Sequence, residues 1–195
     1  MEKYLKKSYT YKEYISLLEN LMLQGKTTGE TQTDELINYA NLNLARIHRL
    51  EKTVEITPEL KELILNIKHN YTWLVITEGW CGDAAQNITP LYFITQLNPK
   101  INLALVLRDD NLDLMDKYLT NGGRSIPKLI CLDENNKEIF NWGPRPIAAQ
   151  KIVQELMANK ATLEEKSLTI QKWYNTDKTL SLQNEFVELI KKHMI

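Results

Sequence analysis

The chain has 195 residues, 43% of them hydrophobic, and its 24 Lys and Arg against 25 Asp and Glu leave a formal net charge of -1. A chain of this length can bury one sizeable core, so we expect a single domain over residues 1–195. The even charge balance argues against nucleic acid and anionic membranes as partners. No segment has the ~18 continuous apolar residues that span a bilayer, and the first residues lack the apolar stretch of a secretory signal. We therefore expect a cytoplasmic protein.

Apolar residues recur at helical spacing through the first part of the chain. They predict helices over about 11–24 and 33–52, with Thr33 capping the second, and a third helix that opens at Thr57 and Pro58. No motif with recognisable chemistry lies in this part. The sequence therefore predicts that residues 1–70 form an all-helical N-terminal extension.

Two buried strands with a helix between them follow this extension. The run 73–77 is apolar and partly β-branched, which is typical of a strand buried on both faces. A helix is expected over about 82–97, bent or interrupted at Pro90, and a second strand over 101–107. A short helix over 112–119 comes next. Two strands connected through a helix should be parallel, with a right-handed crossover.

A hairpin and three further helices complete the chain. Pro127 introduces a strand over 128–132, and a polar turn leads into an antiparallel partner over 138–142. Helical spacing then predicts helices that begin near positions 147, 163 and 179. The result is an α/β fold with a four-stranded mixed central sheet flanked by helices. Its core spans 71–158, and C-terminal helices occupy 159–195.

Cys81 is located where the first strand turns into a helix. The first N–H groups of a helix have no internal partner and carry the positive end of its dipole, which lowers the pKa of a thiol placed there. Asp83 acts in the opposite direction, because a nearby carboxylate disfavours the thiolate, although it stabilises the start of the helix. We expect Cys81 to be solvent-accessible with a depressed pKa. The alternative is an ordinary small hydrophobic residue in the core.

The order strand, helix, strand, helix, hairpin, helix resembles the thioredoxin superfamily, with Trp-Cys-Gly at the first strand-to-helix turn and Ile-Pro before the third strand. The resemblance covers roughly residues 71–158. More narrowly, the chain is similar to a bacterial branch of thioredoxin-like proteins with helical N- and C-terminal additions. The stretches that carry the resemblance are Trp80-Cys81-Gly82-Asp83-Ala84, Leu107-Arg108-Asp109, Arg124-Ser125-Ile126-Pro127 and Trp142-Gly143-Pro144-Arg145-Pro146.

The resemblance implies a role for several of these residues. In thioredoxins the first Cys of a Cys-X-X-Cys pair attacks a substrate disulfide, and the second resolves the mixed disulfide. Cys81 takes the attacking position, but Ala84 stands at the resolving one and has no sulfur. Pro127 matches the cis-proline of the superfamily. Its role would be to present the backbone of Ile126 beside Cys81, where an extended peptide or a thiol ligand can pair with it.

Three arginines, Arg108, Arg124 and Arg145, flank strand ends that this fold gathers around the thiol. Together with Ser125 they are candidate substrate contacts, as a cationic rim that lowers the thiol pKa and holds an anionic thiol such as glutathione or a CoA-type molecule. Each arginine can instead be a solvated loop charge or the partner of a nearby aspartate.

Two tryptophans are expected near the thiol. Trp80 and Gly82 border it in the sequence, and the resemblance brings Trp142 to the same side. Trp80 and Trp142 would provide a flat apolar wall for a substrate, or they simply pack in the core. Cys131 is predicted to be buried, because at ~3.3 Å per residue it lies about 13 Å along its strand from Pro127, too far for a disulfide with Cys81.

Three functions remain open at this stage. The leading hypothesis is a monothiol thiol-disulfide exchanger, in which Cys81 attacks a protein disulfide or the disulfide of a low-molecular-weight thiol and an external thiol resolves the intermediate. The first alternative is a non-catalytic binding module that has lost its redox pair. The second is a thiol sensor or peroxidase in which Cys81 becomes a sulfenic acid. We expect no metal, since the three histidines have no ligand spacing, and no cofactor. The oligomeric state is left open.

Overall fold

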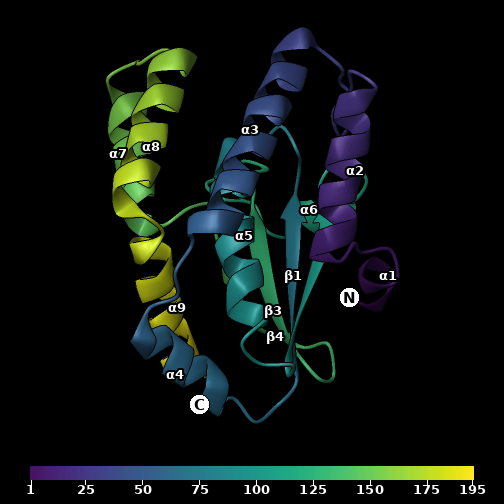
Figure 1. The fold of residues 1–195 in the computed structure, drawn as a ribbon, viewed down its shortest axis with the longest axis vertical. Coiled ribbons are helices and arrows are strands. Elements are labelled where there is room, and N and C mark those ends of the chain that lie inside the picture. The colour runs from purple at the N-terminus through teal and green to yellow at the C-terminus, as the bar shows by residue number, and fades with distance from the viewer.

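A four-stranded sheet in the order β2-β1-β3-β4 forms the centre of the computed structural model, which describes residues 1–195 (Figure 1). Strands β1 (Tyr71–Thr77) and β2 (Ile101–Leu107) are parallel, and α5 (Gly82–Thr95) connects them. Strand β3 (Lys128–Asp133) runs antiparallel to both β1 and β4 (Glu138–Trp142). The predicted mixed sheet is therefore confirmed, with each strand within two residues of its expected bounds.

Eight helices other than α5 surround this sheet. Three of these helices are preceded by a threonine whose hydroxyl accepts from the third helical N–H, as the sequence indicated for Thr33, and this satisfies one of the unpaired donors at the helix start. The helices are α1 (Glu2–Leu5), α2 (Tyr11–Leu23), α3 (Asp34–Thr53), α4 (Pro58–Asn66), α6 (Leu112–Met115), α7 (Ile147–Ala158), α8 (Leu163–Asp177) and α9 (Leu180–His193).

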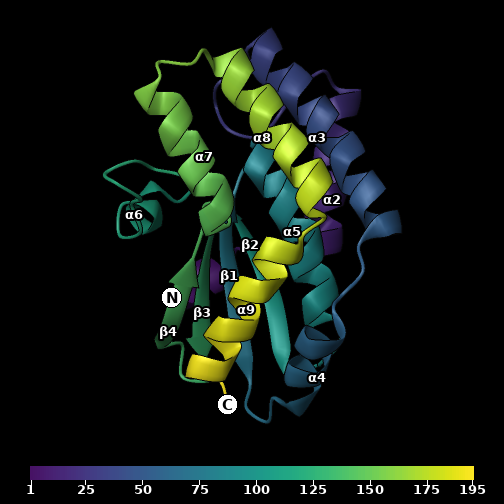
Figure 2. The same ribbon diagram turned by 90° about the vertical axis from the view of Figure 1, so that its left-hand side faces the viewer.

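One face of the sheet packs against helices from both ends of the chain. Trp73 and Val75 of β1 share a single buried cluster with Tyr14 of α2, Ile64 of α4 and Phe186 of α9. Figure 2 shows α9 in front of this face, with the pair α7 and α8 beyond the end of the sheet. The main hydrophobic core is therefore built jointly by the central sheet and both helical extensions.

The opposite face of the sheet has a thinner cover. Leu74 and Ile76, which alternate with the residues of the first face, pack with Tyr4 of α1 and with Leu114 and Met115 of α6. The middle of β1, from Trp73 to Ile76, is buried on both faces and is entirely apolar, as its sequence indicated.

Three details differ from the sequence-based expectation. Helix α5 continues through Pro90, which is buried, so packing offsets the backbone hydrogen bond that a proline removes. Helix α6 ends at Met115 and does not reach position 119. Tyr9 exchanges backbone hydrogen bonds of 2.8 and 2.9 Å with Leu105, and so covers the edge of β2 from within the extension expected to be purely helical.

Candidate functional site

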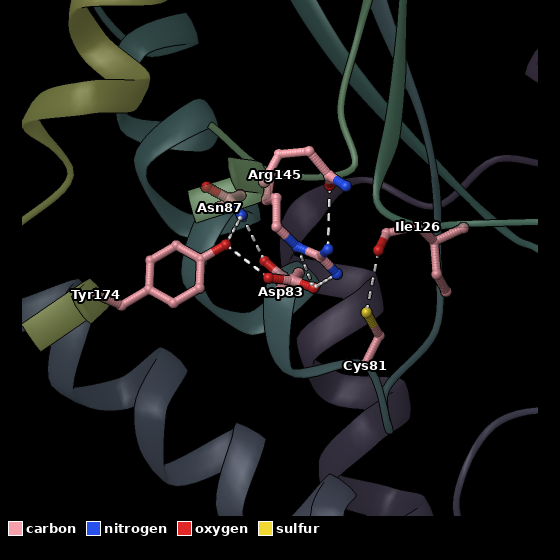
Figure 3. Close-up of polar contacts among 7 residues, drawn as sticks. Cys81, Asp83, Asn87, Ile126, Arg145 and Tyr174 are labelled. Carbon is pink, nitrogen blue, oxygen red and sulfur yellow. Dashed lines mark hydrogen bonds and ion pairs between the residues drawn. The ribbon is translucent and has the colours of Figure 1, made fainter. Parts of the chain in front are cut away.

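Cys81 is the residue immediately before α5, at the end of the turn that follows β1. It is partly exposed, and its Sγ–H donates to the carbonyl oxygen of Ile126 over 3.3 Å (Figure 3). The peptide bond between Ile126 and Pro127 is cis. The sulfur therefore lies at the N-terminus of a 14-residue helix and faces the backbone that precedes Pro127, as the sequence predicted.

The protonation state of Cys81 differs from the prediction. Burial raises the pKa of the Cys81 thiol to about 12, and the charge of Asp83 raises it further. The N–H groups of Ala84 and Asp83 and the guanidinium of Arg145 act in the opposite direction but do not compensate. The expected depressed pKa is therefore wrong, because the desolvation of the sulfur outweighs the positive end of α5.

Asp83 is the centre of a polar network that joins three parts of the chain (Figure 3). Arg145, from the segment between β4 and α7, forms an ion pair with it and donates from Nε to Asp83 Oδ2 over 3.0 Å. Tyr174 of α8 donates its hydroxyl to Asp83 Oδ1 over 2.7 Å, and Asn87 donates to the Tyr174 oxygen over 3.0 Å. The carboxylate next to the thiol is thus held by a cation and a hydroxyl.

Arg108 and Asp109 lie at the end of β2 beside Trp80. The Arg108 guanidinium is 4.7 Å from the centre of the Trp80 ring, a cation–π geometry, and it pairs with Asp109 over 2.8 Å. Arg108 therefore covers part of the tryptophan that was expected to offer a free apolar surface.

The predicted cationic rim is not formed. Arg124 makes an exposed, two-pronged pair with Asp116 over 2.6 and 2.9 Å, and Ser125 is half-buried without a side-chain hydrogen bond. Arg108 and Arg145 face Asp109 and Asp83 as described above. Each of the three candidate arginines is thus paired with an aspartate, which agrees with the alternative stated for them from the sequence.

Trp142 also departs from a substrate-binding role. It is 7% exposed, its Nε1 donates to Glu185 over 2.6 Å, and its ring packs at 5.5 Å from that of Phe186. Both partners belong to α9. The C-terminal extension therefore takes up the surface that Trp142 was expected to present, and of the two tryptophans only Trp80 remains partly exposed beside the thiol.

No second sulfur is available to Cys81. Ala84, at the position of the resolving cysteine, is buried in the main core, and Cys131 is fully buried at the point where β3 pairs with Trp73. Burial raises the pKa of the Cys131 thiol to about 12 as well. The prediction of a buried Cys131 is confirmed.

The N-terminal extension contacts the same turn from the other side. Glu78 is fully buried three residues before Cys81; its Oε1 accepts from the Asp109 N–H over 2.9 Å, and its Oε2 has no partner. Burial raises the pKa of Glu78 to about 7, while the Thr28 hydroxyl and the Asp109 N–H act to lower it. Thr28 Oγ1 also accepts from the Gly79 N–H over 2.9 Å.

Helix α3 also holds the turn between β1 and α5 in place. Asn43, which is fully buried, donates to the Gly79 carbonyl over 3.0 Å and accepts from Arg46 Nη1 over 2.7 Å. A Cβ atom at Gly82 would lie 3.5 Å from the same Arg46 nitrogen. The guanidinium of Arg46 therefore lies beside the residue that follows Cys81.

Sequence reasoning missed Glu78, Asn43, Arg46 and Tyr174. Glu78 carried a weak signal, as a lone acid between an apolar strand and the Trp-Cys-Gly stretch. The others are single polar residues on helices far from Cys81 in the chain, and only the packing of α3 and α8 against α5 brings them to it.

Comparison with known proteins agrees with this architecture. A family model described as thioredoxin matches residues 29–160, more than half of the chain. The chain belongs to the thioredoxin family. The match begins within the N-terminal extension, before the 71–158 core on which the resemblance in the sequence depends.

Solved structures show the same fold over nearly the whole chain. A protein of unknown function from Pseudomonas aeruginosa is 21% identical, with a TM-score of 0.58, covering 94% of this chain and 98% of that one. An HIV epitope scaffold is also 21% identical, with a TM-score of 0.56, and covers 94% of this chain and 99% of its own. No curated protein matches the sequence. None of the helices has both the length and the apolar character required to cross a membrane.

Proposed function

We propose that this thioredoxin-family protein is a monothiol thiol-disulfide exchanger that uses Cys81. The observation that carries the proposal is the position of the Cys81 sulfur, which belongs to a partly exposed residue at the N-terminus of α5 and lies 3.3 Å from the Ile126 carbonyl, with the other cysteine fully buried. A substrate sulfur that approaches Cys81 would meet the amides of α5 on one side and the Ile126 backbone on the other.

The exchange consists of two balanced steps. The Cys81 thiol loses its proton to solvent, and the thiolate attacks one sulfur of a disulfide R–S–S–R′, forming Cys81–S–S–R and releasing R′–S⁻, which takes up a proton. A second, external thiolate R″–S⁻ then attacks the R sulfur of the mixed disulfide, forming R–S–S–R″ and releasing the Cys81 thiolate, which takes up a proton. No net oxidation of the protein occurs, and an external thiol is required because Ala84 has no sulfur.

The neutral resting thiol makes this reaction slow at neutral pH. A pKa of about 12 in place of 9.0 lowers the thiolate fraction about 1000-fold. A more basic thiolate is more nucleophilic, with a Brønsted coefficient of about 0.4–0.5, which restores about 20–30-fold. We therefore expect Cys81 to react on the order of 50-fold more slowly than an ordinary cysteine.

The same observation favours a second function. A protonated, largely desolvated thiol that donates to Ile126 is also what a binding module would retain after losing its redox pair. In that case the surface around Trp80 and Pro127 would bind an extended peptide, and Cys81 would not form mixed disulfides in the folded protein.

The two functions differ in the pH dependence of the thiol. The folded protein would be mixed with 4,4′-dithiodipyridine, an uncharged disulfide, and the rate followed by absorbance from pH 6 to 10. Exchange predicts a rate that rises about tenfold per pH unit without a plateau, and peptide mapping that places the adduct on Cys81. Reaction only after denaturation would overturn the exchange and support the binding module.

The matched control is Cys81→Ser. This variant retains Cys131, whose sulfur is fully buried, and should not react while folded. A Cys81→Ser protein that reacts as fast as the wild type would show that Cys131, and not Cys81, is the accessible thiol.

A further inference from the structure

Two arginines of α3, Arg46 and Arg49, form no ion pair, and Arg46 is the one beside the turn that holds Cys81. Arg108, Arg124 and Arg145, the three that flank the strand ends, are each paired with an aspartate, whereas Arg46 forms no ion pair. A guanidinium has five N–H donors, and Arg46 uses one of its nitrogens, Nη1, on a neutral acceptor, Asn43 Oδ1. Most of its hydrogen-bonding capacity and all of its charge are therefore available.

The surroundings of Arg46 do not compensate its charge. Burial lowers the pKa of Arg46, and the like charge of Arg49, one turn further along α3, lowers it again; the only group that raises it is Tyr39. A half-buried cation without a carboxylate destabilises the folded protein until an anion joins it. An anionic ligand would provide the negative partner that the chain itself does not place beside Arg46.

The position of Arg46 relative to the turn that holds Cys81 is fixed. Asn43 holds the guanidinium and is itself tied to the carbonyl of Gly79, two residues before Cys81. On the other side of Cys81, Gly82 has no side chain, and a Cβ there would lie 3.5 Å from Arg46 Nη1. Gly82 is the first residue of α5, so the cation lies beside the first turn of this helix, where the helix dipole also favours negative charge.

We propose that Arg46 binds the carboxylate of an anionic low-molecular-weight thiol whose sulfur reacts at Cys81. The fork of the guanidinium suits a carboxylate bound through two oxygens, and the proposed ligand carries that carboxylate a few bonds from the sulfur that reacts at Cys81. This inference rests on the proposed exchange. It assigns the substrate contact to α3 of the N-terminal extension, in place of the arginines at the strand ends.

The test compares two disulfides that differ in charge. Rates of Cys81 modification would be measured with the uncharged 4,4′-dithiodipyridine and with 5,5′-dithiobis(2-nitrobenzoate), which carries two carboxylates. In Arg46→Gln, the rate with the anionic reagent should fall about tenfold relative to wild type, the size of one charge-assisted contact, while the rate with the neutral reagent should stay within about twofold. Arg46→Lys, which keeps the charge and loses the fork, should lie between the two.

Arg49→Gln is the matched control. Arg49 lies on the same helix, is exposed and donates to Asn175 over 2.8 Å, so its removal should change neither rate by more than about twofold. Equal losses with both reagents, or no selective loss in Arg46→Gln, would overturn the role of Arg46.

A non-covalent measurement separates this proposal from the exchange. S-methylglutathione, which has carboxylates but no free thiol, should bind Cys81→Ser, and adding Arg46→Gln should weaken that binding about tenfold. If wild type reacts with neither disulfide but this difference in binding is found, the exchange fails and the anion contact stands. Binding that Arg46→Gln leaves unchanged overturns the contact, even where the neutral disulfide reacts.

Discussion

Two carboxyl groups flank Cys81, and they differ in their hydrogen-bond and ion-pair partners. Glu78, on the side of the N-terminal extension, is fully buried, and one of its oxygens has no hydrogen-bond partner. Asp83, on the side of the C-terminal helices, accepts from Arg145 and from the Tyr174 hydroxyl. Glu78 is therefore desolvated without a cation bound to it, whereas Asp83 is desolvated with the Arg145 guanidinium bound to it.

The difference shows how two added segments take distinct roles at one turn. The N-terminal extension contacts the turn mainly through neutral groups, with Thr28 and Asn43 bound to the backbone of Gly79, and it fixes where the turn lies. The C-terminal extension contacts Asp83 through the Tyr174 hydroxyl, and this hydrogen bond reduces the effect of the Asp83 charge on the sulfur. If this division is correct, changes on the first side alter stability without changing the thiol pKa, and changes on the second alter the thiol pKa.

The largest expected effect follows from replacing Glu78 with Gln. Burial raises the pKa of Glu78 from 4.5 to about 7, so the folded protein retains the proton longer than the unfolded chain does. Wild-type stability should therefore fall as pH rises from 4.5 to about 7. Glu78→Gln, which mimics the protonated acid, should match wild type near pH 4 and exceed it by about 2–4 kcal/mol at pH 8.

Urea unfolding of both proteins at several pH values measures this difference. The charged and polar groups that face Glu78 are Thr28, Arg108 and Asp109, and all three are unchanged in the variant. A difference in unfolding free energy that is constant with pH would show that Glu78 does not titrate in this range.

The fold was largely predictable, because it depends on local patterns. Apolar runs gave the four strands, and helical spacing with hydroxyl caps gave the long helices. Tyr9 could not be placed, because a single residue that pairs with the edge of β2 leaves no periodic signal.

The site was predictable only in part. Cys81 and Ile126 were placed correctly because they border regular elements. The protonation of the thiol was not, since it depends on how deeply the sulfur is desolvated, and that is set by helices that meet only in the folded chain. An aspartate partner for each arginine was one of the alternatives drawn from the sequence, and the structure has such a pair for all three.

A smaller effect is expected from Asn43→Ala on the side of the N-terminal extension. The substitution leaves the Gly79 carbonyl without the side-chain donor that it has in wild type and frees Arg46, so the unfolding free energy should fall by about 1–3 kcal/mol. The pH dependence of the rate with 4,4′-dithiodipyridine should keep its slope, since no charge is removed. A rate that levels off near neutral pH in this variant would show that the N-terminal side also controls the thiol pKa.

The smallest change in stability, and the sharpest test of the comparison, is Tyr174→Phe. Burial holds the pKa of Tyr174 well above its usual value, so its hydroxyl is a donor to Asp83 throughout the range in which the thiol reacts. The variant loses only this hydroxyl, while Arg145 still pairs with Asp83, so the unfolding free energy should fall by only about 0.5–1.5 kcal/mol. The uncompensated part of the Asp83 charge should raise the thiol pKa and slow reaction with 4,4′-dithiodipyridine at every pH below it. A faster reaction in Tyr174→Phe would mean that α8 acts by covering the sulfur and not by balancing the charge beside it, and the division between the two extensions would then fail on its C-terminal side.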